Sequence, residues 1–149
     1  MEYSQAYEDR NTSVTRVYYE DRVELLNKFG QVTLSTLNDG FSILREYNEK
    51  GFEMLYKTSD GVTANHFYDD NDNLIRTEIS TGSEYRYDLN GNCIYQKLSN
   101  DHIIWNIYDI NNKMIYHRER CNGEEKINIY DPDTHELIHS ITRDIGCEK

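Results

Sequence analysis

A short pattern that returns about every 21 residues constrains the fold of this chain more than any other feature of its sequence. The most typical copy is Tyr87-Asp88-Leu89-Asn90-Gly91, in which an aromatic residue precedes an acid and a turn-forming Asn-Gly pair. Copies start near residues 7, 26, 47, 68, 87, 108 and 130, and those at 7 and 26 are the weakest. Because such a period indicates repeated supersecondary units, we expect one repeat domain over residues 1–149, with about seven repeats.

A second set of turn residues lies between these copies, at Asp39-Gly40, Asp60-Gly61, Thr81-Gly82, Asn100-Asp101 and Asn122-Gly123. Together the two sets place turn candidates at 30, 40, 51, 61, 72, 82, 91, 101, 112, 123 and 134. Apart from Thr134, these positions hold Gly, Asp or Asn, which readily adopt the positive φ of tight hairpins. The segments between them are rich in aromatic and β-branched residues. The spacing therefore predicts an all-β fold, an antiparallel β-hairpin repeat ribbon forming a curled or rolled single sheet.

The seventh and eighth positions of each repeat hold mostly apolar residues. Counted from the leading aromatic residue, they are Val32-Thr33, Glu53-Met54, Leu74-Ile75, Cys93-Ile94, Met114-Ile115 and, after a one-residue insertion, Leu137-Ile138. We expect these pairs to fill core positions. Cys93 is then a small buried hydrophobic residue rather than a reactive nucleophile.

The repeated pattern resembles the YD repeat of Rhs and teneurin-type proteins, and the resemblance covers roughly 130 residues. It implies a continuous antiparallel ribbon of hairpins, which in large Rhs proteins spirals into a shell around a toxin domain. With seven copies this chain is too short to enclose a cargo, so we expect the hairpin architecture to transfer and the encapsulating function not to. MORN-like repeats, also built on Tyr and Gly hairpins, are the neighbouring alternative.

The charge of the chain bears on its partners. It has 16 Lys and Arg against 27 Asp and Glu, a net charge of −11. This charge argues against nucleic-acid binding and against adhesion to anionic membranes. The N-terminus lacks the basic-then-apolar order of a secretory signal, so we expect a cytoplasmic protein. Its odd number of widely spaced cysteines, 3, is typical of reduced thiols.

Two strings in the sequence match sites of known chemistry, and neither is convincing. The H-E-x-x-H string at residues 135–139 needs a helix to bring both histidines to one zinc, whereas it follows a repeat turn. The acidic segment 69–73 has Leu74 and Ser80 where a calcium loop of the EF-hand type needs Gly and Glu. Its carboxylates are expected to bond their own turn, with a weak calcium site as the alternative. We therefore expect no enzyme activity, no cofactor and no metal.

The remaining candidates are binding residues. Trp105 lies in the most apolar segment and is expected to pack within the sheet, with an exposed anchor as the alternative. We interpret the chain as a non-enzymatic acidic module that docks on a basic protein surface, such as a bacterial or phage inhibitor, immunity or anti-defence protein. The alternative is a carbohydrate-binding module using exposed tyrosines, and self-association would cover the terminal strands. The candidate binding residues are Asp69, Asp70, Asp72, Tyr95, Trp105, Tyr116, Glu124 and Glu125.

Overall fold

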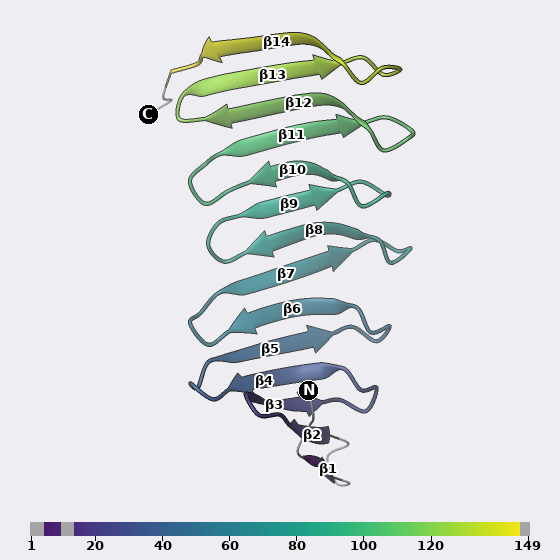
Figure 1. The fold of residues 1–149 in the computed structure, drawn as a ribbon, viewed down its shortest axis with the longest axis vertical. Coiled ribbons are helices and arrows are strands. Elements are labelled where there is room, and N and C mark those ends of the chain that lie inside the picture. The colour runs from purple at the N-terminus through teal and green to yellow at the C-terminus, as the bar shows by residue number, and fades with distance from the viewer. Residues whose placement is uncertain (1–4, 10–13, 147–149) are drawn as a thin grey trace. The chain divides into compact units, whose positions relative to one another are not determined.

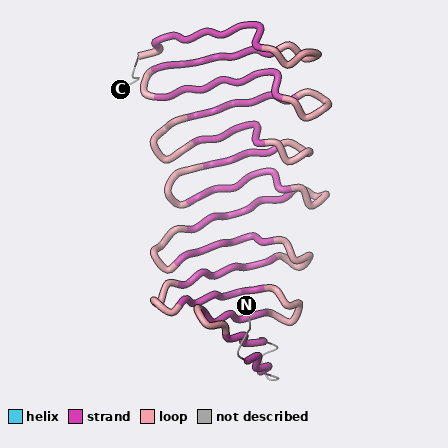
Figure 2. The backbone as a smooth tube through the Cα atoms, in the orientation of Figure 1, coloured by secondary structure: helices cyan, strands magenta, loops and turns pink. Residues whose placement is uncertain are grey.

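The computed structural model describes the backbone of residues 5–9 and 14–146 and the side chains of residues 14–146. The described segments form strands and turns without a helix (Figure 2). This confirms the expected all-β class and hairpin-repeat architecture. None of the described residues belongs to a helix that could cross a membrane. The strands are β1 (Gln5–Asp9), β2 (Val14–Tyr18), β3 (Arg22–Leu26), β4 (Val32–Leu37), β5 (Ser42–Tyr47), β6 (Glu53–Thr58), β7 (Thr63–Tyr68), β8 (Leu74–Ile79), β9 (Glu84–Tyr87), β10 (Cys93–Lys97), β11 (Ile103–Tyr108), β12 (Met114–Cys121), β13 (Glu124–Tyr130) and β14 (Leu137–Asp144).

Within each compact unit of the chain, strand order follows the order of the sequence (Figure 1). The chain divides into two compact units, residues 1–65 and 66–149. In the first unit each strand from β1 onward pairs antiparallel with the next, up to β7. In the second unit β8 to β14 pair in the same way. One domain over residues 1–149 stays a prediction.

An Asp or Asn after the leading residue of the repeat closes the turn in six described repeats. Oδ1 of Asp88 accepts hydrogen bonds from the backbone N–H groups of Asn90 and Asn92, both at 2.9 Å. The backbone N–H of Gly91 donates to the carbonyl of Asp88 at 3.0 Å, and Gly91 has a φ of 83°. Equivalent side-chain bonds are made by Asn27, Asn48, Asp69, Asp109 and Asp131. Asn and Asp are therefore interchangeable at this position because only an acceptor oxygen is required.

Backbone conformation confirms nearly all of the expected turn positions. Positive φ angles occur at Gly30, Gly40, Gly51, Gly61, Asp72, Gly82, Gly91, Asp101, Asn112, Asn122 and Gly123. The last turn was placed one residue too early, because His135, with a φ of 60°, takes the left-handed conformation expected of Thr134. The insertion widens this turn, and the N–H of Asp131 donates to the carbonyl of Glu136 at 2.8 Å.

The expected core positions are wrong, because the second residue of the pair lies at a β-bulge in the five repeats whose pairing the structure describes. In the pairing of β9 with β10, Cys93 lies opposite Tyr87 and Tyr95 opposite Arg86, so Ile94 has no partner. The register skips Thr33, Met54, Ile115 and Ile138 in the same way. Such extra residues bend the strand and turn their side chains out of the regular alternation.

No apolar side chain is buried among residues 14–146; the buried residues are Ser35, Thr58, Thr77, Ser83 and Glu125. Cys93 is half-buried rather than buried, and its Sγ donates to the carbonyl of Tyr95 at 3.3 Å. Burial raises the pKa of the Cys93 thiol. A single layer of sheet has no second layer to cover its side chains, which explains the missing core.

The leading tyrosine of a repeat holds the preceding strand. The hydroxyl of Tyr47 donates to the carbonyl of Val32 at 2.8 Å, and that of Tyr108 to the carbonyl of Cys93 at 3.5 Å. Val32 and Cys93 are both position-seven residues, beside the bulge. The tyrosine of one repeat thus satisfies a carbonyl where the bulge of the previous repeat interrupts the ladder.

Candidate binding surface

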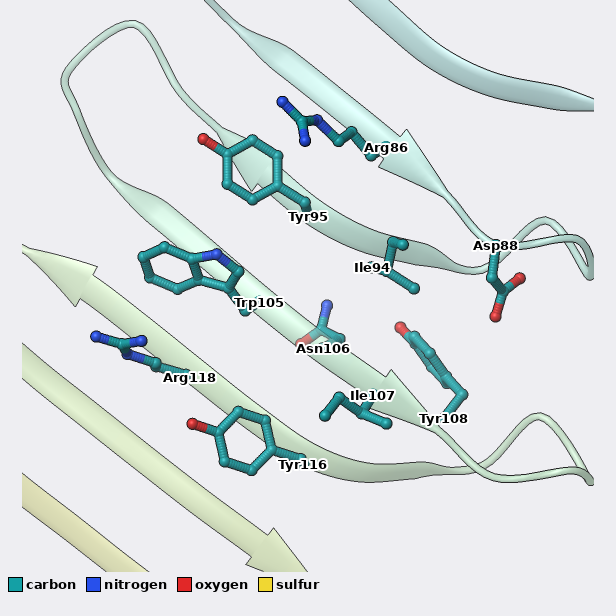
Figure 3. Close-up of a pocket in the computed structure, with 10 residues that line it drawn as sticks. All are labelled: Arg86, Asp88, Ile94, Tyr95, Trp105, Asn106, Ile107, Tyr108, Tyr116 and Arg118. Atoms are coloured by element: carbon teal, nitrogen blue, oxygen red, sulfur yellow. The ribbon is translucent and has the colours of Figure 1, made fainter. Parts of the chain in front are cut away.

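Four side chains line up across strands β9 to β12 on one face of the second unit. Arg86 lies opposite Tyr95, Tyr95 opposite Trp105, and Trp105 opposite Arg118. Figure 3 shows the four in this order, each from the next strand. We call them the arginine–aromatic row.

Each member of the row contacts the next. The guanidinium carbon of Arg86 lies 5.0 Å from the ring centroid of Tyr95, and that of Arg118 lies 4.7 Å from the ring of Trp105. The two rings meet edge to face, with centroids 6.0 Å apart and planes at 63°. Contacts between a cation and an aromatic ring contribute about 0.5–1 kcal/mol each at exposed sites. The row therefore ties four strands together where no core does.

An open groove of about 730 Å³ follows the row. Its apolar lining includes Tyr95 and Trp105, together with Ile107 and Tyr116, which lie opposite each other on β11 and β12. Its further lining residues are Arg86, Asp88, Ile94, Asn106, Tyr108 and Arg118, as Figure 3 shows. The groove thus unites three candidate residues from the sequence, Tyr95, Trp105 and Tyr116.

Two arginines, Arg86 and Arg118, flank the aromatic rings. Arg86 is paired through Nε with Oε1 of Glu84 at 2.6 Å. The whole face carries more cations than acids. The cations are Arg76, Arg86, Lys97, Arg118, Arg120 and Arg143, and the acids are Glu78, Glu84 and Glu125, by their positions in the strand register.

Glu125 is a structural carboxylate rather than a docking residue. It is 1% exposed and lies between two arginines of the neighbouring strands. Its Oε1 accepts from Nε of Arg118 at 2.7 Å, and its Oε2 from Nε of Arg143 at 2.6 Å. The hydrogen bond from Arg118 and then that from Arg143 hold the pKa of Glu125 below its usual value. Arg118 is thereby fixed at the end of the row. Glu124, the residue before Glu125 in the chain, is exposed.

The acids of the second unit gather on the edge formed by its repeat turns. Antiparallel alternation places the turns 69–73, 88–92, 109–113 and 131–136 on the same edge, and Asn92 Nδ2 donates to Oδ1 of Asn112 in the next turn at 3.1 Å. We call it the acidic edge. Its acids are Asp69, Asp70, Asp72, Asp88, Asp109, Asp131, Asp133 and Glu136, against the single basic residue Lys113.

The three candidate aspartates of this edge have different roles. Asp69 closes its turn, and hydrogen bonds from Asn73 lower the pKa of its carboxyl. Asp70 is exposed. Asp72 occupies the left-handed position of the turn, with a φ of 67°. Asp70 is therefore the most accessible of the three for a partner.

The H-E-x-x-H string is not helical, as expected. His135 lies in the last turn and His139 in β14, opposite Ile129. Among the residues that the structure describes, no three His, Cys, Asp or Glu side chains gather as metal ligands would.

Sequence reasoning missed Arg86 and Arg118. Counting outward from the turn at Asn100-Asp101 places Tyr95 opposite Trp105, so part of the row could have been found. The Arg86 pairing could not be found in this way, because the bulge at Ile94 shifts the register between β9 and β10.

No family model and no curated protein matches this chain. Its fold is similar to solved structures of toxin components: a Photorhabdus luminescens Tc holotoxin pore with mutated TccC3, the TcdB2–TccC3–Cdc42 complex and TcdB2–TccC3. The TM-scores are 0.53, 0.51 and 0.51, with 16% identity in each case over 87% of this chain. The chain spans 8% of the length of those chains. The similarity supports an Rhs-like β-repeat fold.

Proposed function

We propose that this chain is a non-enzymatic, acidic protein-binding module that docks on a basic protein surface. The observation that carries the proposal is the acidic edge, where turns from four repeats present acids with one opposing lysine. A continuous negative edge speeds the approach of a basic partner and fixes its register.

The carboxylates of this edge suit binding better than catalysis. Hydrogen bonds from turn groups lower the pKa of Asp69, Asp88 and Asp131. They therefore stay charged near neutral pH, whereas a general acid needs a raised pKa. A lasting negative charge is what docking on a basic surface requires.

The biological role that we infer is inhibition or scaffolding of a basic protein in the cytoplasm, as in an immunity or anti-defence protein. Structural neighbours of the chain are components of a toxin complex. A toxin-related partner is therefore part of the proposal.

The partner is first captured from a bacterial lysate by affinity to the immobilised wild-type chain. The test then compares the association kinetics of this captured partner with the wild-type protein and with the Asp70→Lys, Asp133→Lys double variant. Both side chains are exposed, and neither supplies the acceptor that closes its turn. Association is expected to slow in the double variant and to weaken between about 50 and 500 mM salt.

The control is Glu46→Lys, an exposed acid on β5 of the first unit. It makes the same reversal at one position outside the acidic edge and should leave association near the wild-type rate. Binding that is indifferent both to the double reversal and to salt would refute the proposal.

Carbohydrate binding is the second candidate, and the aromatic groove favours it. Tyr95, Trp105 and Tyr116 offer ring surfaces beside polar groups. Titration with neutral oligosaccharides should then change the fluorescence of Trp105 equally at low and high salt. An unchanged signal would eliminate this candidate.

A further inference from the structure

We propose that the arginine–aromatic row is a second docking surface, which binds an extended, acidic segment of a partner protein. The segment has the pattern acid–x–aromatic–x–acid. This surface lies on the sheet face and shares only Asp88, which lines the groove from its turn, with the acidic edge. The row itself contains no residue of that edge, so the inference does not depend on the proposed function.

Charge complementarity selects the partner. The strands of the face that carries the row hold six cations, Arg76, Arg86, Lys97, Arg118, Arg120 and Arg143, against three acids, while the whole chain has a charge of −11. Two further acids come from turns, Asp101, which pairs with Lys97 at 3.5 Å, and Asp88, which lines the groove, so cations still outnumber acids. Its cations flank aromatic rings in the groove. A ligand that fits must therefore be negative at its ends and apolar between them.

The arginines of the row are accessible at both ends of the groove. The side chain of Arg86 is 54% exposed and that of Arg118 is 37% exposed. Glu84 and Glu125 hold them through Nε, which fixes each planar guanidinium over its ring. Guanidinium groups held in this way are preorganised for carboxylates, so little side-chain entropy is lost on binding.

Spacing sets the pattern of the segment. Arg86 and Arg118 are three strands apart, which is about 14 Å at the usual distance between neighbouring strands. Residues i and i+4 of an extended chain are about 13 Å apart and, like residue i+2, point to the same side. Acids at i and i+4 therefore reach the two arginines, and an aromatic residue at i+2 lies over Tyr95 and Trp105.

A protein segment fits this face better than a nucleic acid or a second copy of the chain. A nucleic acid carries a negative charge at every phosphate and would be repelled by the acidic edge nearby. Two isolated carboxylates avoid most of that repulsion because salt screens charges beyond about 8 Å. Two copies stacked by this face would bring their arginines together.

The test measures fluorescence anisotropy of a labelled peptide with the full chain at about 50 mM salt. The probe is Gly-Ser-Glu-Ser-Phe-Ser-Glu-Ser-Gly, and its control is the same composition with adjacent acids, Gly-Ser-Ser-Phe-Glu-Glu-Ser-Ser-Gly. The probe should bind at least about threefold more tightly than the control, in line with one exposed ion pair.

Variants assign the binding to the row. Arg86→Gln should weaken probe binding about threefold to fivefold, and Arg86→Lys, which keeps the charge but not the fork, should weaken it less. The matched control is Arg45→Gln in the first unit, because Arg45 likewise pairs with a glutamate, Glu53, and lies 5.4 Å from a tyrosine ring, that of Tyr56. It should leave binding unchanged.

Four outcomes overturn the inference. Equal affinity for the two peptides contradicts the spacing argument. An equal loss of probe affinity in Arg45→Gln and Arg86→Gln shows that the row is not the binding site. A labelled oligothymidylate that binds more tightly than the peptide, and is lost in Arg86→Gln, identifies a nucleic-acid surface instead. A dimer in sedimentation that Arg86→Gln dissociates identifies self-association.

Discussion

At the scale of single residues, stability comes from side chains that satisfy the backbone or one another rather than from apolar burial. The Asn or Asp at the second position of each described repeat stabilises the turn, because its side-chain oxygen accepts two backbone N–H bonds in five of the six described copies. In the sixth, Asp131 accepts from Asp133 and Thr134 because of the insertion. These bonds are local, which is why the sequence alone predicts the turns.

Replacement of Glu125 is expected to destabilise three strands at once, since this residue joins β12, β13 and β14 through two arginines. Glu125→Gln should lower the free energy of unfolding by about 1.5–3 kcal/mol, the range for hydrogen bonds to charged groups. Urea unfolding at pH 7 measures this change. The exposed neighbour offers the matched control, Glu124→Gln, which should change stability by less than about 0.5 kcal/mol.

The same carboxylate should make stability depend on pH. Its pKa is lower in the folded protein than its ordinary value of 4.5. The stabilisation is therefore complete above about that value and is lost as the pH falls through the lower folded pKa. Unfolding of Glu125→Gln should be less sensitive to acid than that of the wild type. Parallel pH profiles for the two proteins would contradict this assignment.

At the scale of elements, the strand that follows the repeat turn contains a β-bulge in β4, β6, β10, β12 and β14. Adjacent apolar residues such as Cys93-Ile94 and Met114-Ile115 break the alternation of a strand, and this break is the signal of the bulge. Interpreted as core positions, they led to a wrong prediction. Turn chemistry could be predicted because it depends on neighbouring residues, whereas cross-strand partners depend on a register that each bulge shifts by one.

Trp105 lies within the row across β9 to β12, between Tyr95 on one neighbouring strand and Arg118 on the other. Trp105→Ala removes the contacts with Tyr95 and Arg118. Because the ring is half-buried, we expect a loss of about 1–3 kcal/mol in the free energy of unfolding, below the 3–5 kcal/mol of a core tryptophan. Ile110→Ala, at a turn residue that is 95% exposed, is the control and should be nearly neutral. A loss as small as that of the control would show that the row does not stabilise the sheet.

At the scale of the whole molecule, the overall charge of −11 does not show that acidic and basic side chains gather on different parts of the second unit. Acids of the second unit gather at its repeat turns, while arginines flank aromatic rings on its sheet face. The sequence placed Tyr95, Trp105 and Tyr116 among the binding residues. It did not place arginines beside them, because that requires the bulge-shifted register.

Hydrogen–deuterium exchange of the chain with its captured partner tests the central claim, docking through the acidic edge, most directly. At low salt we expect added protection in the turns 69–73, 88–92, 109–113 and 131–136, and none in the turns of the opposite edge at 80–83 and 99–102. Protection confined to the opposite edge, or to the first unit, would contradict the account.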